Sequence, residues 1–151
     1  MLILSDILYD NKIALTFSLI VSALITILSI LPLAIARYSK GISIQKIKEP
    51  RALFEFIPRW GKRAKWAHDN TLESFSLYAP SALLCIFTLQ PPFFESELIF
   101  IVSFLYPTLR FIYIPAYIFN LGVLRAFLWG GSVFCSGCLY FHSLKNIMYN
   151  F

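Results

Sequence analysis

The residue that stands out for its chemistry is Arg110, which lies inside the apolar run LIFIVSFLYPTLRFIYIPAYIF. Residues three, four or seven apart share one face of a helix, so Tyr106, Tyr113 and Tyr117 lie on the same face as Arg110. An arginine near the middle of a membrane costs at least ~2.5 kcal/mol, so it faces a bundle interior or a water-filled cavity. Because a guanidinium binds a carboxylate through paired hydrogen bonds, this face predicts a site for an anionic ligand.

Two other apolar segments carry polar residues that fit the same site. Arg63, Asn70 and Glu73 are spaced by seven and three, so they share one helix face, and Arg125 and Trp129 are one turn apart on another helix. A cation beside a thiol lowers the pKa of that thiol and favours the thiolate. Together these residues predict a membrane pocket for a small anionic molecule, for which a thiol is a candidate.

A simpler interpretation of the same residues stays open. Arg63 and Arg125 would be anchors at the membrane surface, and Trp129 and the tyrosines would form an aromatic belt there. Glu73 would then pair with Arg110 and neutralise it.

Other kinds of site find little support in the sequence. His68 and His142 are far apart and have no carboxylates at ligand spacing, so no metal site is expected. Neither a serine–histidine–acid set nor a glycine-rich phosphate loop is evident. Cys135 and Cys138 form a CSGC spacing, but it lies in an apolar run without a second ligand pair, so we expect these thiols to pack a helix face.

The elements that hold these residues are membrane helices. The chain of 151 residues is 58% hydrophobic and 14% charged, whereas soluble domains have about 25% charged residues. Segment 13–36 has no charge and, at roughly 1.5 Å per residue, would span ~36 Å, more than the ~30 Å of a bilayer core. We therefore expect an integral membrane protein, retained by this segment rather than cleaved after it, because the run is too long and its leader too acidic for a signal peptide.

The pattern predicts one all-α domain over residues 1–151, an antiparallel bundle of four transmembrane helices. Two prolines after Gln90 end the second helix, and the short link near NLGVL makes the third and fourth helices antiparallel neighbours. The predicted helices are about 13–36, 62–89, 97–120 and 124–142.

Basic residues predict the orientation in the membrane. Most of them lie between the first and second apolar runs, whereas the loop at 90–97 has none. The positive-inside rule therefore places the basic loop 37–61 in the cytoplasm and both termini on the other side. This loop is either a solvated segment or lies on the membrane, where its lysines would meet anionic lipid. The net charge of +5 then reflects topology, and no nucleic-acid partner is expected.

The segments that carry these residues resemble a known family. RAKWAHDNTLESF at 63–75 and RFIYIPAY at 110–117, followed by LRA at 124–126, are similar to the signature of the MAPEG family, the membrane-associated proteins in eicosanoid and glutathione metabolism. The resemblance covers most of the chain and is nearest to a bacterial branch. It implies a homotrimer of four-helix subunits in a bacterial inner membrane, with glutathione bound between subunits from the cytoplasmic side.

Matching by motif position implies a role for each site residue. Asn70 and Glu73 match second-helix glutathione and structural positions, and Arg63 begins the same signature. The third-helix binding positions correspond to Arg110, Tyr113 and Tyr117. Arg125 matches the arginine thought to stabilise the thiolate in the prostaglandin and leukotriene synthases. The implied reaction is attack of glutathione thiolate on a lipophilic electrophile, or reduction of a lipid hydroperoxide.

The chain departs from the eicosanoid enzymes at three positions. These enzymes carry arginines one and four positions before the asparagine, where this chain has Asp69 and Trp66. They also have a tyrosine one turn after the last arginine, where this chain has Trp129. A non-catalytic membrane scaffold or lipid-binding protein with the same fold is therefore the alternative prediction.

Overall fold

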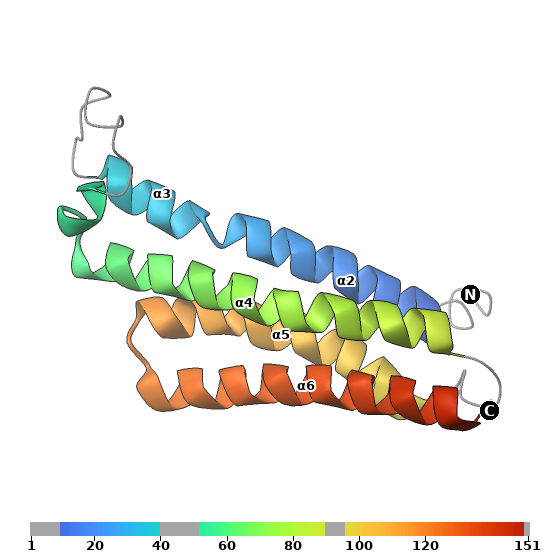
Figure 1. Cartoon of the computed structure of the whole chain (residues 1–151). Coiled ribbons are helices and arrows are strands. Elements are labelled where there is room, and N and C mark those ends of the chain that lie inside the picture. Colours follow the sequence, from blue (N-terminus) through green and yellow to red (C-terminus); the bar gives the residue numbers. More distant parts are fainter. Residues whose placement is uncertain (1–9, 40–51, 90–95, 150–151) are drawn as a thin grey trace, which may run out of the picture.

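Helices make up almost all of the chain that the structure describes. The computed structural model describes residues 10–39, 52–89 and 96–149, within which it has no strand. Long helical rods lie side by side along one direction (Figure 1). The elements are α2 (Asn11–Leu28), α3 (Leu31–Tyr38), the short 3-10 helix η2 (Ala52–Glu55), α4 (Arg59–Thr88), α5 (Glu97–Ile118) and α6 (Gly122–Tyr149). The all-α prediction is thus confirmed for these residues.

The first rod is broken rather than continuous. The sequence predicts one helix over 13–36, but α2 ends at Leu28 and α3 begins at Leu31. Pro32 explains the break, because it has no N–H to donate to the carbonyl of Leu28 and its ring crowds that turn. Ser29, at the break, donates its hydroxyl to the Thr26 carbonyl at 2.6 Å.

Three rods are long and apolar enough to cross a membrane. They are α2 with α3, α5, and α6. The second predicted membrane segment corresponds to α4, a helix of 30 residues whose first half is rich in charge. α4 starts well before the level at which α5 ends, since Arg63 contacts the carbonyl of Ile118. We call this end of the molecule, which holds α3, η2 and the first turns of α4, the basic end (Figure 1).

The core combines apolar side chains with many small hydroxyls. Leu15, Ala82, Cys85, Cys135 and Leu139 are buried together between α2, α4 and α6. Buried hydroxyls bond mostly to carbonyls of their own helices, which satisfies them without widening the spacing between helices. Those that bond in this way are Thr26, Thr71, Ser81, Ser103, Ser132, Ser136 and Ser143. The cysteines form no disulfide among the described residues, which agrees with the packing role predicted for Cys135.

Two close approaches set the geometry of the basic end. α3 crosses α4 at Gly61, where an added Cβ would lie 2.5 Å from the Cβ of Ala36. α5 ends at Ile118, and Asn120, two residues later, has a φ of 62°, the left-handed conformation that follows the end of many helices. The N–H of Asn120 bonds to the Tyr117 carbonyl and that of Leu121 to the Ala116 carbonyl. This tight turn brings the first turn of α6 back beside the last turn of α5.

Residues 40–51 of the predicted basic loop 37–61 lie outside the described residues. Its described parts belong to the end of α3, to η2 and to the first residues of α4. The beginning of α2 and the end of α6 lie together at the end of the bundle opposite the basic end (Figure 1). There, Asn11 donates to the Ser96 carbonyl at 3.2 Å, and His142 Nε2 lies 3.2 Å from the Ser96 hydroxyl.

Candidate functional site

Arg110 is the most deeply buried charged residue at the centre of the site. Its side chain projects from α5 into the bundle and is 1% exposed. Its Cζ lies 4.7 Å from the ring centre of Tyr113, a cation–π contact. The hydroxyls of Tyr106 and Tyr113 lie nearby, but neither accepts a well-formed hydrogen bond, so Nε, Nη1 and Nη2 all lack a partner in the described chain. The protein therefore holds five N–H donors of a buried cation ready for an acceptor.

Two stacked tyrosines form the inner limit of the site. The rings of Tyr78 and Tyr106 lie 3.6 Å apart and almost parallel. The Tyr78 hydroxyl is 2.6 Å from that of Ser18 on α2, and the Tyr106 hydroxyl is 3.1 Å from that of Ser74 on α4. Sequence reasoning placed Tyr106 beside Arg110 but missed Tyr78, although the four-residue spacing from Ser74 to Tyr78 puts both on one face of α4.

Toward the basic end, the site continues through two tyrosines to a second arginine. Tyr113 and Tyr117 are in edge-on contact, with ring centres 5.6 Å apart. The guanidinium carbon of Arg125, on the first turn of α6, lies 4.4 Å from the ring centre of Tyr117. Tyr117 and Arg125 are both partly exposed. The turn at Asn120 produces this contact, because it returns α6 along the last turn of α5.

The α4 residues form one side of the site. Arg63 is half-buried and donates from Nε to the Ile118 carbonyl at 2.7 Å. Asn70 donates to the Trp66 carbonyl of its own helix at 2.9 Å. Glu73 is exposed and interacts electrostatically with Tyr113.

The structure does not form the ion pair considered for Glu73 and Arg110. Among the described residues, the sole ion pair joins Lys65 and Asp69. Glu73 precedes Ser74, which pairs with Tyr106 in the middle of α5. Glu73 therefore lies at the level of the middle of α5 and is exposed in the chain described.

The predicted residues therefore fall into two groups. One continuous row runs through Arg110, Tyr113, Tyr117 and Arg125 on α5 and α6. The other lies on α4, where each residue is near the row but leaves it open to one side. We call the whole set the polar cluster: Arg63, Asn70, Glu73, Arg110, Tyr113, Tyr117 and Arg125.

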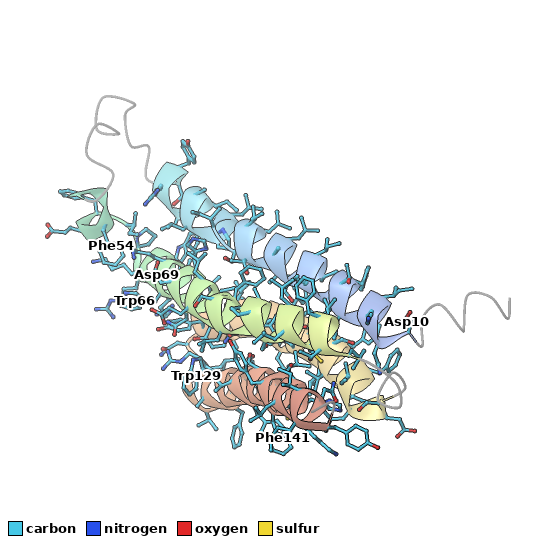
Figure 2. The ribbon with its side chains drawn as sticks, turned by 45° about the vertical axis from the view of Figure 1, so that its right-hand side comes forward. Asp10, Phe54, Trp66, Asp69, Trp129 and Phe141 are labelled. Atoms are coloured by element: carbon cyan, nitrogen blue, oxygen red, sulfur yellow. The ribbon has the colours of Figure 1, made fainter. Side chains whose placement is uncertain are left out.

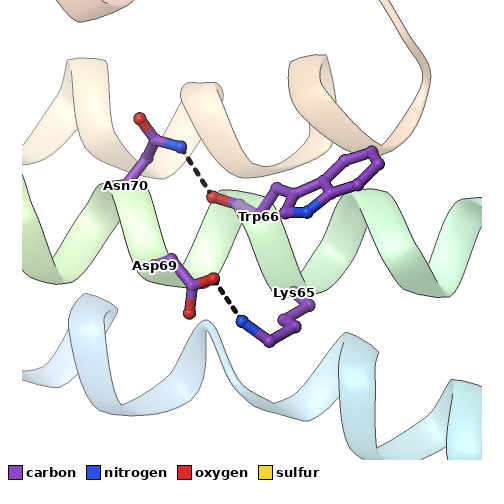
Figure 3. Close-up of polar contacts among 4 residues, drawn as sticks. All are labelled: Lys65, Trp66, Asp69 and Asn70. Atoms are coloured by element: carbon purple, nitrogen blue, oxygen red, sulfur yellow. Dashed lines mark hydrogen bonds and ion pairs between the residues drawn. The ribbon is translucent and has the colours of Figure 1, made fainter. Parts of the chain in front are cut away.

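Asp69, one of the departures from the family pattern, faces away from the polar cluster. Its Oδ2 forms an ion pair with Nζ of Lys65, one turn earlier on α4, at 2.5 Å. Asp69 and Asn70 project to different sides of α4 (Figure 3). Within one subunit its charge is thus compensated and does not oppose a ligand carboxylate beside Arg110.

The other departures lie at the open side of the cluster. Trp66 and Trp129 are 45% and 48% exposed, and Figure 2 shows them on α4 and α6. Trp129 offers a ring and an indole N–H where the family pattern has a phenol.

The remaining candidate features lie apart from the cluster. His68 Nδ1 is 2.6 Å from the Ser29 hydroxyl, while His142 lies at the opposite end of the bundle. No group of three metal-binding side chains is present among the described residues. An apolar groove of about 290 Å³ lies between the α2–α3 break and α5. None of the polar cluster residues lines it.

The polar cluster is suited to bind an anion that carries a reactive atom. A ligand carboxylate would satisfy the donors of Arg110, which now have no acceptor. A thiol placed beside Arg125 would lie next to a cation that favours its ionised form. The partly exposed position of Arg125 leaves room for a second reactant there.

Comparison with known proteins gives one match. The model of the MAPEG family matches residues 15–145, which include the whole polar cluster. No curated protein and no solved structure matches the chain.

Proposed function

The chain belongs to the MAPEG family, and on this premise we propose that its polar cluster binds glutathione and activates the thiol against a lipophilic electrophile or a lipid hydroperoxide. Family membership, together with three helices long and apolar enough to span, makes it an integral membrane protein. The substrate reaches such a site from the lipid, and the tripeptide from the water.

The buried Arg110 is the observation that carries the proposal. Its three nitrogens have no hydrogen-bond partner, and a buried unpaired cation is too costly to retain for packing alone. A glutathione carboxylate would supply the missing acceptors. Asn70, Arg63, Tyr113 and Tyr117 would hold the rest of the peptide, with Glu73 near its ammonium group.

Arg125 would act on the sulfur. Its guanidinium would stabilise the thiolate, which attacks the electrophilic carbon to form a C–S bond while the leaving group departs. With a hydroperoxide, two glutathione molecules would be oxidised to the disulfide, and the products would be the alcohol and water.

The proposal includes a homotrimer with the site at a subunit contact, oriented with the basic end in the cytoplasm. The position of Glu73 supports this arrangement, because a membrane carboxylate on the outside of a single subunit requires a polar partner. A neighbouring subunit beside α4 would supply that partner and close the open side of the cluster. The antiparallel course of the helices and the periplasmic position of the termini belong to the same proposal.

Thermal unfolding of the detergent-purified protein with millimolar glutathione tests the proposal. A ligand at ~100 times its dissociation constant stabilises the folded state by about 2.7 kcal/mol, so we expect a clear rise in Tm. S-methylglutathione, which lacks the thiol, is expected to give a similar rise without turnover. The absence of a shift with either peptide would contradict the proposal.

Arg125→Ala separates binding from chemistry. We expect it to retain most of the glutathione-induced rise in Tm while losing turnover of chlorodinitrobenzene or an organic hydroperoxide by about 100-fold or more, since removing one charge-stabilising donor costs that much. Activity equal to that of the wild type would exclude the role of Arg125.

A non-catalytic scaffold is the second candidate. It is favoured by Trp129, which cannot supply a phenol at the open side of the cluster. In that case neither peptide would shift Tm, and no electrophile would be turned over by any variant.

A further inference from the structure

A second group of side chains at the basic end takes no part in the proposed function. η2 lies against the first turns of α4 and is held there by Ile57, which is buried with Leu33 and Ala64. Phe54 of η2 packs partly against the same cluster. The rings of Phe54 and Trp66 are in edge-on contact at 6.3 Å, and Figure 2 shows both at this end of the molecule. The packing thus fixes an aromatic pair at the end of the bundle.

Two lysines lie close to the ring of Phe54. The Nζ atoms of Lys62 and Lys65 lie 5.5 Å and 5.9 Å from the ring centre of Phe54. Lys65 also pairs with Asp69 (Figure 3). No carboxylate lies within ion-pair distance of Lys62 or Arg59 in the part of the chain that the structure describes. We call this group the basic–aromatic platform: Phe54, Arg59, Lys62, Lys65 and Trp66.

The platform lies at the level of the membrane surface. Arg63, between its two lysines, bonds to Ile118 at the end of α5, so the platform is level with the end of a membrane-spanning helix. Tryptophan and lysine at such a level are typical of the membrane–water interface.

The two lysines of the platform share one side of α4 with Leu72, beside the polar cluster. Lys62, Lys65, Asp69 and Leu72 follow helical spacing along the outer side of α4, whereas Ala64, Ala67 and Thr71 on the inner side are buried. Further along the outer side, Leu72 and Leu83 are 47% and 42% exposed. On this surface of α4, Lys62 and Lys65 therefore lie near the basic end, and the apolar strip with Leu72 and Leu83 follows further along the helix.

We propose that the basic–aromatic platform binds the phosphate of an anionic phospholipid, with an acyl chain along Leu72 and Leu83. The charges are complementary, because neither Arg59 nor Lys62 has a carboxylate within ion-pair distance among the described residues. The apolar strip below them matches the direction in which a lipid tail enters the bilayer. None of the platform residues belongs to the polar cluster, so this inference does not depend on the proposed function.

Lipid retention measured by native mass spectrometry tests the inference. The full-length protein is released from nanodiscs that contain equal amounts of phosphatidylglycerol and phosphatidylcholine. Each lysine near an anionic surface contributes about fivefold, so we expect wild type to retain phosphatidylglycerol at least about fivefold over phosphatidylcholine. The double variant Lys62→Gln/Lys65→Gln is expected to retain both lipids equally, and the double arginine variant to keep the preference.

Matched variants control for net charge and for folding. Lys12→Gln/Lys145→Gln removes the same charge at the opposite end of the bundle and is expected to keep the preference. Lys65→Gln/Asp69→Asn leaves the net charge unchanged and is expected to keep most of the preference for phosphatidylglycerol. This variant therefore measures the contribution of Lys62 alone. If the double variant does not fold, Lys62→Gln alone is expected to lower the preference severalfold. Equal retention of the two lipids by wild type, or a wild-type preference in folded Lys62→Gln/Lys65→Gln or Lys62→Gln, would overturn the inference.

Discussion

At the scale of single residues, Arg110 decides how the site is interpreted. Its side chain is 1% exposed, and its contact with the Tyr113 ring contributes about 2 kcal/mol. A buried charge without hydrogen bonds costs at least as much, so the arginine lowers stability in the absence of a ligand. Residues that weaken a fold in this way are typical of binding and catalytic sites.

Arg110→Met is therefore expected to separate stability from binding. Without ligand, we expect it to raise the free energy of unfolding by about 1 kcal/mol, because methionine fills similar volume without a charge. The glutathione-induced rise in Tm is expected to disappear, as measured by thermal unfolding in detergent.

Arg110→Lys is the matched control for charge. It keeps the cation but loses the planar fork, so we expect a weakened rise in Tm rather than none. A strong loss of stability in Arg110→Met would instead show that the arginine holds the fold together, as the simpler interpretation of the sequence requires.

At the scale of elements, the approach of α3 to α4 fixes the basic end. Gly61 is required there because no space remains between its Cα and Ala36. By contrast, Gly130 on α6 has no atom within 4 Å of an added Cβ. Two glycines in apparently similar helices therefore have different physical roles.

Gly61→Ala is expected to lower stability by about 1–3 kcal/mol, because α3 must move away from α4. Combining Gly61→Ala with Ala36→Gly is expected to restore most of the lost stability. Gly130→Ala, the matched control, is expected to be neutral or to stabilise α6, since alanine has the higher helix propensity. Thermal unfolding of the three variants and the wild type measures this, and equal effects of Gly61→Ala and Gly130→Ala would show that the crossing is loose.

At the scale of the whole molecule, an exposed strip along the outer side of α4 is the surface on which the proposed trimer depends. Trp66, Glu73, Leu77 and Leu84 follow helical spacing along it, and all are exposed. Polar and apolar residues on the same exposed strip fit a contact with another subunit better than a contact with lipid.

We expect native mass spectrometry of the wild-type protein to give the mass of a trimer. Leu77→Trp or Leu84→Trp is expected to shift the population toward monomers, because extra volume in a packed contact costs about 1–3 kcal/mol. Phe134→Trp, on the outer side of α6, is the control and is expected to leave the trimer intact. A monomeric wild type, or trimers that survive both leucine substitutions, would contradict this arrangement.

The sequence by itself determined the class of protein and the faces of its helices. The length of the uncharged segments predicts membrane helices. The period of the α-helix places Arg110 on one face with Tyr106, Tyr113 and Tyr117. Both predictions depend only on local helix geometry. The break at Pro32 was equally local, and its proline was a signal that the prediction of one helix over 13–36 did not use.

The tertiary structure decided which faces meet. The spacing of residues in the sequence does not predict three of the contacts observed. These are the separation of Glu73 from Arg110, the pairing of Asp69 with Lys65 and the stacking of Tyr78 on Tyr106. They depend on how far each helix is rotated about its axis and where it crosses its neighbours. Packing of many side chains sets these angles together, so no single segment of the sequence contains them.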